Sequence, residues 1–303
     1  MWIIFPRALS RRYEKGFELR VLVTGANGLL GGFLCTELTR QGMALVATGR
    51  RSEKIAKNVT YQRCELDLSE EVDQLLGRTA CDAVVHCATQ KDGEDGIPFV
   101  RNNLVSTINL AEASRRYGVR KFIFASTISV YEGDGPFQED SPTRIENPYA
   151  LSKIAAEHAL QLFARDDFQV VTLRLAGLHG KARKDGVINS MIRNAVSGRA
   201  LKVDEPQSCF SFTFMEDFSE TMITLLKLAW PTPYAVYNLA SPDTLSLSQL
   251  ARLIVARSGS DSVLDNGNGM ARNRTMSVVR LSRSFGVTAR SIEARIKEMT
   301  NEL

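Results

Sequence analysis

A tyrosine and a lysine four positions apart, Tyr149 and Lys153, form the most informative pair of reactive side chains in the chain. On a helix, positions i and i+4 lie on one face, so the phenol and the ammonium group would meet over a single pocket. A lysine there is expected to stabilise the phenolate and to lower the pKa of the tyrosine from its usual value of about 10. Such a tyrosine suits the transfer of a hydroxyl proton while hydride moves the other way. The spacing alone is common on solvated helix faces, so its meaning depends on the rest of the chain.

A glycine-rich turn lies near the start of the chain. The apolar run Leu19–Val23 meets Gly25, Gly28 and Gly31, and an apolar-periodic helix is expected to follow to about Arg40. Glycines at a strand–helix junction let the backbone approach a pyrophosphate, whose charge is met by free N–H groups at the helix N-terminus. The spacing Gly-x-x-Gly-x-x-Gly is looser than the usual dinucleotide fingerprint, and the alternative is a close-packed turn. At the first strand of an α/β pattern, this turn predicts a dinucleotide site.

The second predicted strand, Ala44–Thr48, runs into Gly49, Arg50 and Arg51. An acid at this point would bind the ribose hydroxyls of NAD, whereas arginines favour a 2′-phosphate. We therefore expect NADP as the cofactor, with NAD as the alternative. The competing interpretation is a pair of solvated surface arginines.

Two further segments of the expected sheet bear on a cofactor. Asp67 and Leu68 follow a short strand, where they are placed to hydrogen-bond the edge of an adenine. The run 83–88 reads as a buried parallel strand, and its small last residue, Ala88, leaves room for a cofactor. His86 in that strand is interpreted as a packing residue rather than a ligand.

At this point the chain resembles the extended short-chain dehydrogenase/reductases, the NAD-dependent epimerase/dehydratase family, from about Leu19 to the C-terminus. The motifs that carry the resemblance follow the order of the family: the turn 24–31, Asp67-Leu68, segment 103–109, the strand end 126–131, the pair Tyr149 and Lys153, and segment 173–180.

By this resemblance, Thr127 hydrogen-bonds the reacting oxygen, Tyr149 transfers the proton and Lys153 holds the nicotinamide ribose. Thr127 is assigned because it lies four positions before Tyr131, the tyrosine that closes the strand-end motif. The resemblance also implies a cofactor site, formed by Gly25, Asn27, Gly28, Leu29, Leu30, Gly31, Arg50, Asp67, Leu68, Ala88, Tyr149 and Lys153.

The chain departs from the family pattern at positions that would contact the substrate. Family dehydratases carry an Asp-Glu pair directly after the Ser/Thr, but here Ile128 and Ser129 follow, so dehydration is not expected. Members that act on nucleotide sugars commonly have an Asn at the position of Gly177 and an Arg in the segment that here reads 210–217, where a phenylalanine replaces it. A diphosphate needs cations or amide donors. A nucleotide-sugar substrate would therefore depend on other cations, for which the candidates are Arg193, Arg199 and Arg274.

The composition is that of an ordinary soluble protein with a large core: 44% of the 303 residues are apolar and 24% are charged. A net charge of +4 is too small to indicate binding to nucleic acid or a membrane, and no apolar span of about 18 residues is present. Five cysteines without a Cys-x-x-Cys pair, and only three histidines, argue against a metal site or a disulfide framework. We therefore expect a cytoplasmic protein.

Alternating strands and helices over residues 19–175 predict an α/β fold, a Rossmann-type doubly wound parallel sheet that binds the dinucleotide. Residues 176–303 are expected to form mainly a small substrate-binding lobe without a core of its own, with some segments returning to the Rossmann domain. Residues 1–18 lie outside the family pattern and are interpreted as an N-terminal extension, with organelle targeting as the alternative.

The predicted helix 149–164 is apolar nearly all round. A helix of that kind is buried on two sides. One side covers the sheet, and family members commonly pair the other with its copy. We therefore expect a homodimer, with the predicted helix 98–117 as the neighbouring element of the contact.

These observations predict an NAD(P)-dependent oxidoreductase that interconverts a secondary alcohol and a ketone. Its small-molecule substrate is either a nucleotide-linked sugar, as for a sugar 4-ketoreductase, or a smaller carbonyl compound. The alternative among enzymes is a nucleotide-sugar epimerase that uses the same three residues. From another class, the chain could be an NADP-sensing scaffold without turnover, although a sensor has no need of Thr127, Tyr149 and Lys153 together.

Overall fold

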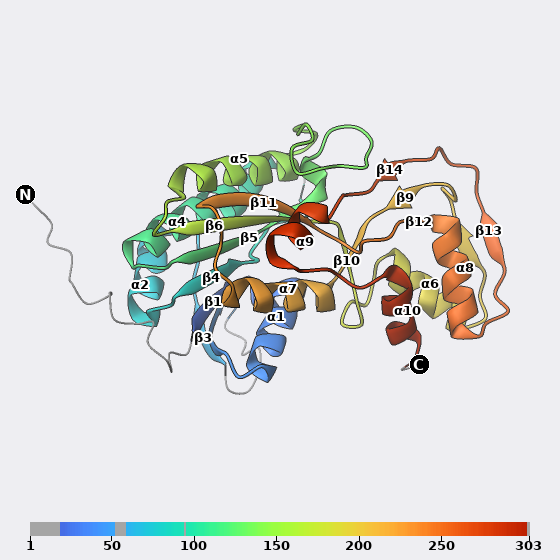
Figure 1. Ribbon diagram of the computed structural model, residues 1–303, viewed down its shortest axis with the longest axis horizontal. Helices are drawn as coiled ribbons and strands as arrows, with labels where there is room; N and C mark the ends of the chain where they lie inside the picture. Colours follow the sequence, from blue (N-terminus) through green and yellow to red (C-terminus); the bar gives the residue numbers. More distant parts are fainter. Residues whose placement is uncertain (1–18, 52–58, 94, 302–303) are drawn as a thin grey trace, which may run out of the picture.

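The structure is a computed structural model that describes residues 19–51, 59–93 and 95–301. Figure 1 shows a broad sheet with helices above and below it, and a smaller lobe at one end that contains α6, α8 and α10. The extension expected over residues 1–18 lies outside the described residues.

Seven parallel strands form the sheet, in the order β11-β6-β5-β4-β1-β2-β3. They are β1 (Arg20–Thr24), β2 (Ala44–Gly49), β3 (Thr60–Arg63), β4 (Ala83–His86), β5 (Lys121–Thr127), β6 (Gln169–Leu175) and β11 (Tyr234–Leu239). The order reverses at β1, which pairs with β2 on one side and β4 on the other. In such sheets, ligands bind beyond the carboxyl ends of the strands at the reversal. The predicted α/β fold with a Rossmann-type sheet is confirmed.

Helices cover both faces of the sheet, because successive strand residues point to opposite faces. Val21 and Val23 of β1 pack on the face covered by α1 (Leu29–Arg40), α7 (Met215–Lys227) and α9 (Val279–Phe285). Leu22, between them, packs on the face covered by α2 (Ser69–Thr79), α4 (Ser106–Arg116) and α5 (Pro148–Phe163).

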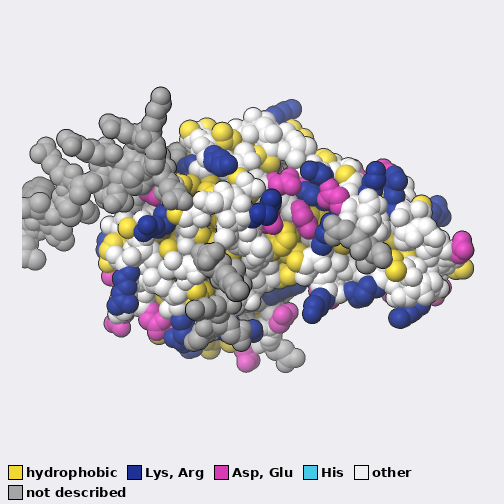
Figure 2. Space-filling model, turned by 90° about the horizontal axis from the view of Figure 1, so that it is seen from below, with side chains coloured by type: hydrophobic (Ala, Val, Ile, Leu, Met, Phe, Trp, Pro, Cys, Tyr) yellow, Lys and Arg dark blue, Asp and Glu magenta, His cyan; other side chains and the backbone are white. Residues whose placement is uncertain are grey.

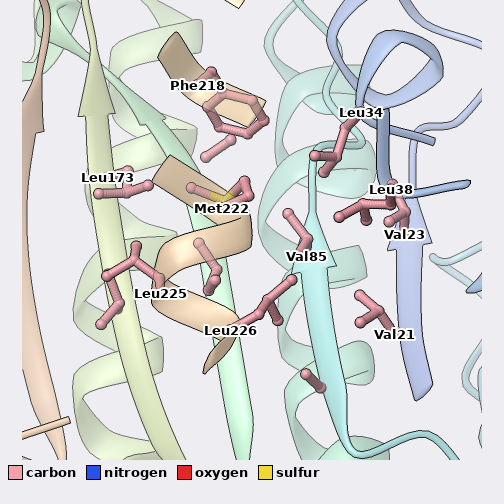
Figure 3. Packing of buried hydrophobic residues seen from close by; sticks show 14 of the residues in the cluster. Val21, Val23, Leu34, Leu38, Val85, Leu173, Phe218, Met222, Leu225 and Leu226 are labelled. Carbon is pink, nitrogen blue, oxygen red and sulfur yellow. The ribbon is translucent and has the colours of Figure 1, made fainter. Parts of the chain in front are cut away.

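The apolar residues of α7 recur every three or four positions, which gives the helix one buried face. Figure 3 shows Phe218, Met222 and Leu226 of this helix between Leu173 of β6 and Val85 of β4. Each such side chain contributes roughly 1.5–3 kcal/mol when fully buried. Residues distant in sequence thereby hold α7 against the dinucleotide-binding half of the chain.

The smaller lobe has a core of its own, contrary to the expectation from the sequence. Its buried apolar residues come from α6 (Val187–Val196), β8 (Leu201–Val203), β10 (Phe212–Phe214), α8 (Leu247–Ser258) and α10 (Ile292–Thr300). The predicted helices each have a strongly apolar face, and these faces pack on one another rather than on the large sheet. Short strand pairs complete the lobe: β7 (Gly177–His179) with β10, β8 with β13 (Leu264–Asn266), and β9 (Cys209–Phe210) with β12 (Leu245–Ser246) and β14 (Asn273–Arg274).

A buried ion pair joins the lobe to the sheet layer. Arg295 of α10 donates to both carboxylate oxygens of Asp217 in α7, at 2.6 and 3.2 Å, and the side chains are only 4% and 1% exposed. The backbone N–H of Arg290 donates to the same carboxylate at 3.0 Å. Two helices that belong to different cores are therefore tied through one carboxylate.

The described surface carries no single dominant charge in the view of Figure 2, where Lys and Arg side chains are interspersed with Asp and Glu. Within the described ranges, every helix is too short or too polar to span a bilayer. Among these same residues, no three His, Cys, Asp or Glu side chains gather into a group that could hold a metal ion.

Candidate active site

The glycine turn between β1 and α1 is closely packed and leaves the helix end open. Gly25 has a φ of +68°, and a Cβ there would lie 2.6 Å from the backbone nitrogen of Ala88. A Cβ on Gly31 would lie 2.4 Å from the carbonyl oxygen of Gly25. Gly28 caps α1 without a side-chain hydrogen bond, and the first turn of the helix contains no acid. Its free N–H groups and positive dipole end therefore suit an anion.

The corner after β2 is shaped by a contact between Gly49 and Asn27. A Cβ on Gly49 would lie 2.1 Å from Oδ1 of Asn27. That oxygen is held in place, because it accepts hydrogen bonds from the Tyr61 hydroxyl at 2.8 Å and from the Arg51 backbone at 3.3 Å. An acidic side chain at position 49 would therefore require Asn27 to move. Arg50 and Arg51 instead line the cavity at this corner.

The segment after β3 contributes Asp67 but not Leu68. Asp67 lines the cavity, with Arg101 at 3.8 Å from its carboxylate. Leu68 is 49% exposed and caps α2, so its side chain turns away from the residues that line the cavity. Leu66 and Cys64, which the sequence analysis did not select, occupy this wall instead.

One cavity of about 940 Å³ connects the glycine turn to the carboxyl ends of β4, β5 and β6. It brings together all the residues selected from the sequence except Leu68: Gly25, Asn27, Gly28, Leu29, Leu30, Gly31, Arg50, Asp67, Ala88, Thr127, Tyr149 and Lys153. Its far end is closed by the loop 89–92 and by residues 175–178 and 182–185. The cavity thus runs from a dinucleotide cradle to a region that could hold a second molecule.

Tyr149 reaches the cavity because α5 begins just before it. Asn147 caps the helix by accepting the backbone N–H of Ala150 at 2.8 Å, and Pro148 takes the first helical position, which suits its fixed φ. Burial raises the pKa of Tyr149, and hydrogen bonds with Thr127 and Thr89 oppose part of that rise. The phenol therefore lies against the hydroxyl that ends β5.

Lys153, one turn later, is 2% exposed and points under the same cavity. Its Nζ donates to the carbonyl oxygen of Ala125 at 2.8 Å and lies 4.5 Å from the centre of the Phe124 ring. Burial lowers the pKa of the ammonium group to about 8. The expectation that Lys153 lowers the pKa of Tyr149 is not met, because the hydrogen bonds that oppose the effect of burial come from Thr127 and Thr89.

Asn103 is a buried polar residue that opens the family segment 103–109, to which the sequence assigned no role in the site. It lies in a π-helical turn, Val100–Val105, and its amide donates to Ser152 Oγ and to the carbonyl oxygen of Gln90, both at 2.9 Å. The backbone N–H of Gln90 donates back to Asn103 at 2.6 Å. Ser152 donates to the carbonyl oxygen of Tyr149. Asn103 therefore fixes the loop after β4 against the helix that carries Tyr149 and Lys153.

A buried ion pair, Glu157 with Arg174, supports the end of β5. Arg174 of β6 donates to Glu157 of α5 at 2.7 Å, and Ser126, a lining residue, donates to the same carboxylate. Glu157 lies one turn after Lys153 and raises the pKa of that lysine, against the larger effect of burial. The i+4 spacing from Lys153 was the only signal for Glu157 in the sequence, and Arg174 stands in the family segment 173–180 without a role assigned to it.

His86 packs in the sheet, as its strand position predicts. Its Nδ1 lies 2.7 Å from Thr24 Oγ1 and its Nε2 lies 3.0 Å from Thr107 Oγ1. Burial lowers its pKa to about 3, so the ring is neutral at physiological pH.

Comparison with known proteins agrees with this geometry. The model of the NAD dependent epimerase/dehydratase family matches residues 21–240. UDP-glucose 4-epimerase of Bacillus subtilis is 33% identical over 175 residues, which cover 52% of this chain and 52% of that protein. The match thus spans about half of the length of that relative. dTDP-D-glucose 4,6-dehydratase of Homo sapiens is 28% identical over 283 residues, 83% of this chain and 78% of that protein.

Two solved structures extend the comparison to the whole fold. MoeE5, solved in complex with UDP-glucose and NAD, has a TM-score of 0.76 and 28% identity, and the alignment covers 93% of this chain and 99% of that one. UDP-glucose 4-epimerase of Thermotoga maritima, solved with UDP-glucose, has a TM-score of 0.80 at 21% identity, with 94% and 98% covered. At 21% identity, the similarity to the Thermotoga maritima enzyme shows only that the two chains share a fold.

Proposed function

This chain belongs to the NAD dependent epimerase/dehydratase family, within the extended short-chain dehydrogenase/reductases, and from that premise we propose that it is an NADP-dependent oxidoreductase that interconverts a secondary alcohol and a ketone. The observation that carries the proposal is that Thr127, Tyr149 and Lys153 line the same cavity as the glycine turn. A dinucleotide in that cradle would lie beside a proton donor and a buried cation.

The three side chains then have distinct tasks. NADP, when bound, supplies or accepts the hydride. Tyr149 gives its phenolic proton to the carbonyl oxygen during reduction and takes it back from the hydroxyl during oxidation. Thr127, which contacts the phenol, orients the reacting oxygen. Lys153, whose pKa is lowered to about 8, would hold the nicotinamide ribose.

Three observations bear on the kind of activity and on the location, and the first argues against a dehydratase. Ile128 and Ser129 follow Thr127, and neither can act as the acid or base that a dehydratase needs. The free thiols of all five cysteines are consistent with a reducing cytoplasm as the location. Turnover rather than mere sensing is favoured because Tyr149 and Thr127 are in contact at the cavity wall.

A nucleotide-sugar epimerase is the second candidate, and the similarity to UDP-glucose 4-epimerase favours it. The two enzymes differ in how they use the cofactor. An epimerase regenerates its cofactor in every turnover and retains it, whereas a reductase releases it. Denaturing the purified protein and assaying the supernatant for nucleotide tests this: stoichiometric NAD(H) supports the epimerase, and nucleotide-free protein that binds NADPH supports the reductase. Protein that binds neither nucleotide contradicts both.

The cofactor prediction concerns Arg50. Arg50→Asp should weaken NADP binding by about 2–4 kcal/mol, since a charge-assisted contact to the 2′-phosphate is replaced by repulsion. NAD binding should stay the same or improve. Calorimetric titration of both nucleotides measures the effect, with Arg78→Asp, at the far end of α2, as the matched charge control. If the unmutated chain binds NAD as tightly as NADP, the preference is wrong.

The homodimer prediction concerns the outer side of α5. Leu151 and Leu162 lie three turns apart on that helix and are 38% and 75% exposed. Helix α4 packs beside α5. Leu151→Glu should give a folded monomer, because dimerisation would bury an unpaired charge. Light scattering at micromolar concentration reports the mass. Leu228→Glu, at the same 38% exposure beyond α7, should leave the dimer intact. A monomeric unmutated chain would refute the proposal.

A further inference from the structure

The far end of the cavity is lined by cations from two separate loops. Lys91 comes from the loop after β4, and Arg183 and Lys184 come from the loop after β7. Two carboxylates, Asp92 and Asp185, lie among them, so this end carries a net positive charge. Every residue that lines the cavity precedes position 186, so none comes from the core of the smaller lobe.

Arg183 is held in a fixed orientation, with its side chain 19% exposed. Its Nε donates to Asp185 at 2.8 Å and a terminal nitrogen donates to the carbonyl oxygen of Leu178. The other terminal nitrogen has no partner within the described part of the chain. Gly186, at φ +93°, allows this packing, because a Cβ there would lie 3.1 Å from Arg183 Nε and 3.2 Å from the ring of His179.

A buried, neutral histidine lies beneath this loop. His179 is 4% exposed and its ring packs against Phe212 with 5.2 Å between centroids. Burial lowers the pKa of His179 to about 3, so it adds no charge beside Arg183 at neutral pH. The amide of Asn189 donates to the carbonyl oxygen of Gly180 and anchors the start of the loop. The arginine is therefore pre-organised before a ligand arrives.

The other arginines considered for a diphosphate do not line the cavity. Arg274 donates to the carbonyl oxygens of Gly133 and Ile128. Arg193 donates to the carbonyl oxygen of Lys184 and to Ser190. Arg199 is exposed on the smaller lobe.

The residues near Phe210 also fail to replace the missing arginine. Arg272 stacks over the Phe210 ring at 5.6 Å and forms a two-pronged ion pair with Glu205, with both bonds at 2.8 Å. Arg183 is likewise paired with a carboxylate, but unlike Arg183, Arg272 does not line the cavity.

We propose that Arg183, with Lys91 and Lys184, forms a subsite for one compact oxyanion of the substrate, a phosphate monoester or a carboxylate carried by the same molecule as the reacting carbonyl. The inference rests on the proposed oxidoreductase function and narrows its substrate class. The net positive charge suits a single anionic group, and an arginine with one free terminal nitrogen suits its oxygens. A nucleoside diphosphate is the alternative that the test must separate.

The test uses the protein saturated with NADPH, so that the arginines proposed for the 2′-phosphate are already engaged. Inorganic phosphate, acetate and UDP are each titrated by calorimetry into the unmutated chain, Arg183→Gln, Lys184→Gln and Arg199→Gln. Phosphate or acetate should bind the unmutated chain, and the stronger of the two identifies the anion. Arg183→Gln should weaken that binding at least ~10-fold and Lys184→Gln less, whereas Arg199→Gln should change it less than ~2-fold.

Two results would overturn the subsite. In the first, phosphate and acetate do not bind, or both Arg183→Gln and Lys184→Gln leave their affinities unchanged. In the second, UDP binds much more tightly than phosphate or acetate, and Arg199→Gln weakens its binding. Lys184 takes part in a hydrogen bond only through its backbone carbonyl among the described residues, so Lys184→Gln keeps the test meaningful if Arg183→Gln misfolds. If the protein fails to bind NADPH, the proposed function is contradicted. The subsite can still be tested without nucleotide, by titrating phosphate and acetate into the unmutated chain and into Arg183→Gln.

Discussion

Tyr149→Phe is expected to lower turnover by about 10²–10⁴-fold while NADPH affinity stays within a few-fold. The substitution removes only the phenolic hydroxyl, the group that contacts Thr127 and faces the cavity. The ring itself packs against Phe99, with 6.4 Å between centroids, and this contact is retained. Steady-state rates on whichever carbonyl compound or nucleotide sugar the chain converts, together with NADPH fluorescence titration, separate the loss of chemistry from a loss of binding.

Matched variants make this result specific. Tyr117→Phe removes an equivalent hydroxyl from an exposed tyrosine at the end of α4 and should leave the rate unchanged. Thr127→Ser should largely preserve activity and Thr127→Val should weaken it, since only the hydroxyl is needed. Lys153→Met should damage both turnover and cofactor binding. A Tyr149→Phe enzyme with near-full activity on its substrate would refute the oxidoreductase assignment.

Asp217→Ala is expected to lower the free energy of unfolding by about 3 kcal/mol. The substitution leaves the buried guanidinium of Arg295 without its main partner and the backbone N–H of Arg290 without an acceptor. This loss is at the lower end of what is expected when one partner of a buried ion pair is removed, because Arg295 keeps its ion pairs with Glu298 at 2.8 Å and Glu220 at 3.3 Å. Urea denaturation followed by circular dichroism measures the change.

The control for this prediction is an aspartate in an exposed ion pair. Asp73 pairs with Arg116 at 2.5 Å, with side chains 38% and 56% exposed. Asp73→Ala should cost at most about 1 kcal/mol, since water screens the pair. If Asp73→Ala and Asp217→Ala lower the free energy of unfolding equally, burial does not make the Asp217–Arg295 ion pair more stabilising than an exposed one.

The sheet could be predicted from the sequence because its strands and helices alternate in short, regular segments. The apolar run before Gly25 and the small residues at 83–88 have the local patterns of buried parallel strands, and the structure contains β1 and β4 there. The core of the smaller lobe could not be predicted in this way. Ile188 in α6 and Ile296 in α10 belong to one core although more than a hundred residues separate them, and no local periodicity indicates which apolar faces pack together.

The candidate site, too, could be predicted from the sequence only in part. The i+4 spacing places Tyr149 and Lys153 on one helix face, and the resemblance to a family adds Thr127; the structure brings all three to one cavity. The roles of these residues stay predictions. The contacts of Asn103 and Arg183 were not predicted, because they depend on partners that only the folded chain brings near. These are Ser152 on a different helix for Asn103, and a loop folded back on β7 for Arg183.

If the proposed NADP dependence holds, the close approach of Gly49 to Asn27 limits how this enzyme could evolve a preference for NAD. A single mutation that introduces an aspartate at position 49 meets Asn27 Oδ1, which Tyr61 and the Arg51 backbone hold in place. The benefit of the acid would therefore appear only in a background where Asn27 has already changed. Such a dependence is epistasis between two turns that are distant in sequence, and it makes the single-step path to NAD unfavourable. Redesign of the cofactor preference would have to treat the two positions as one unit.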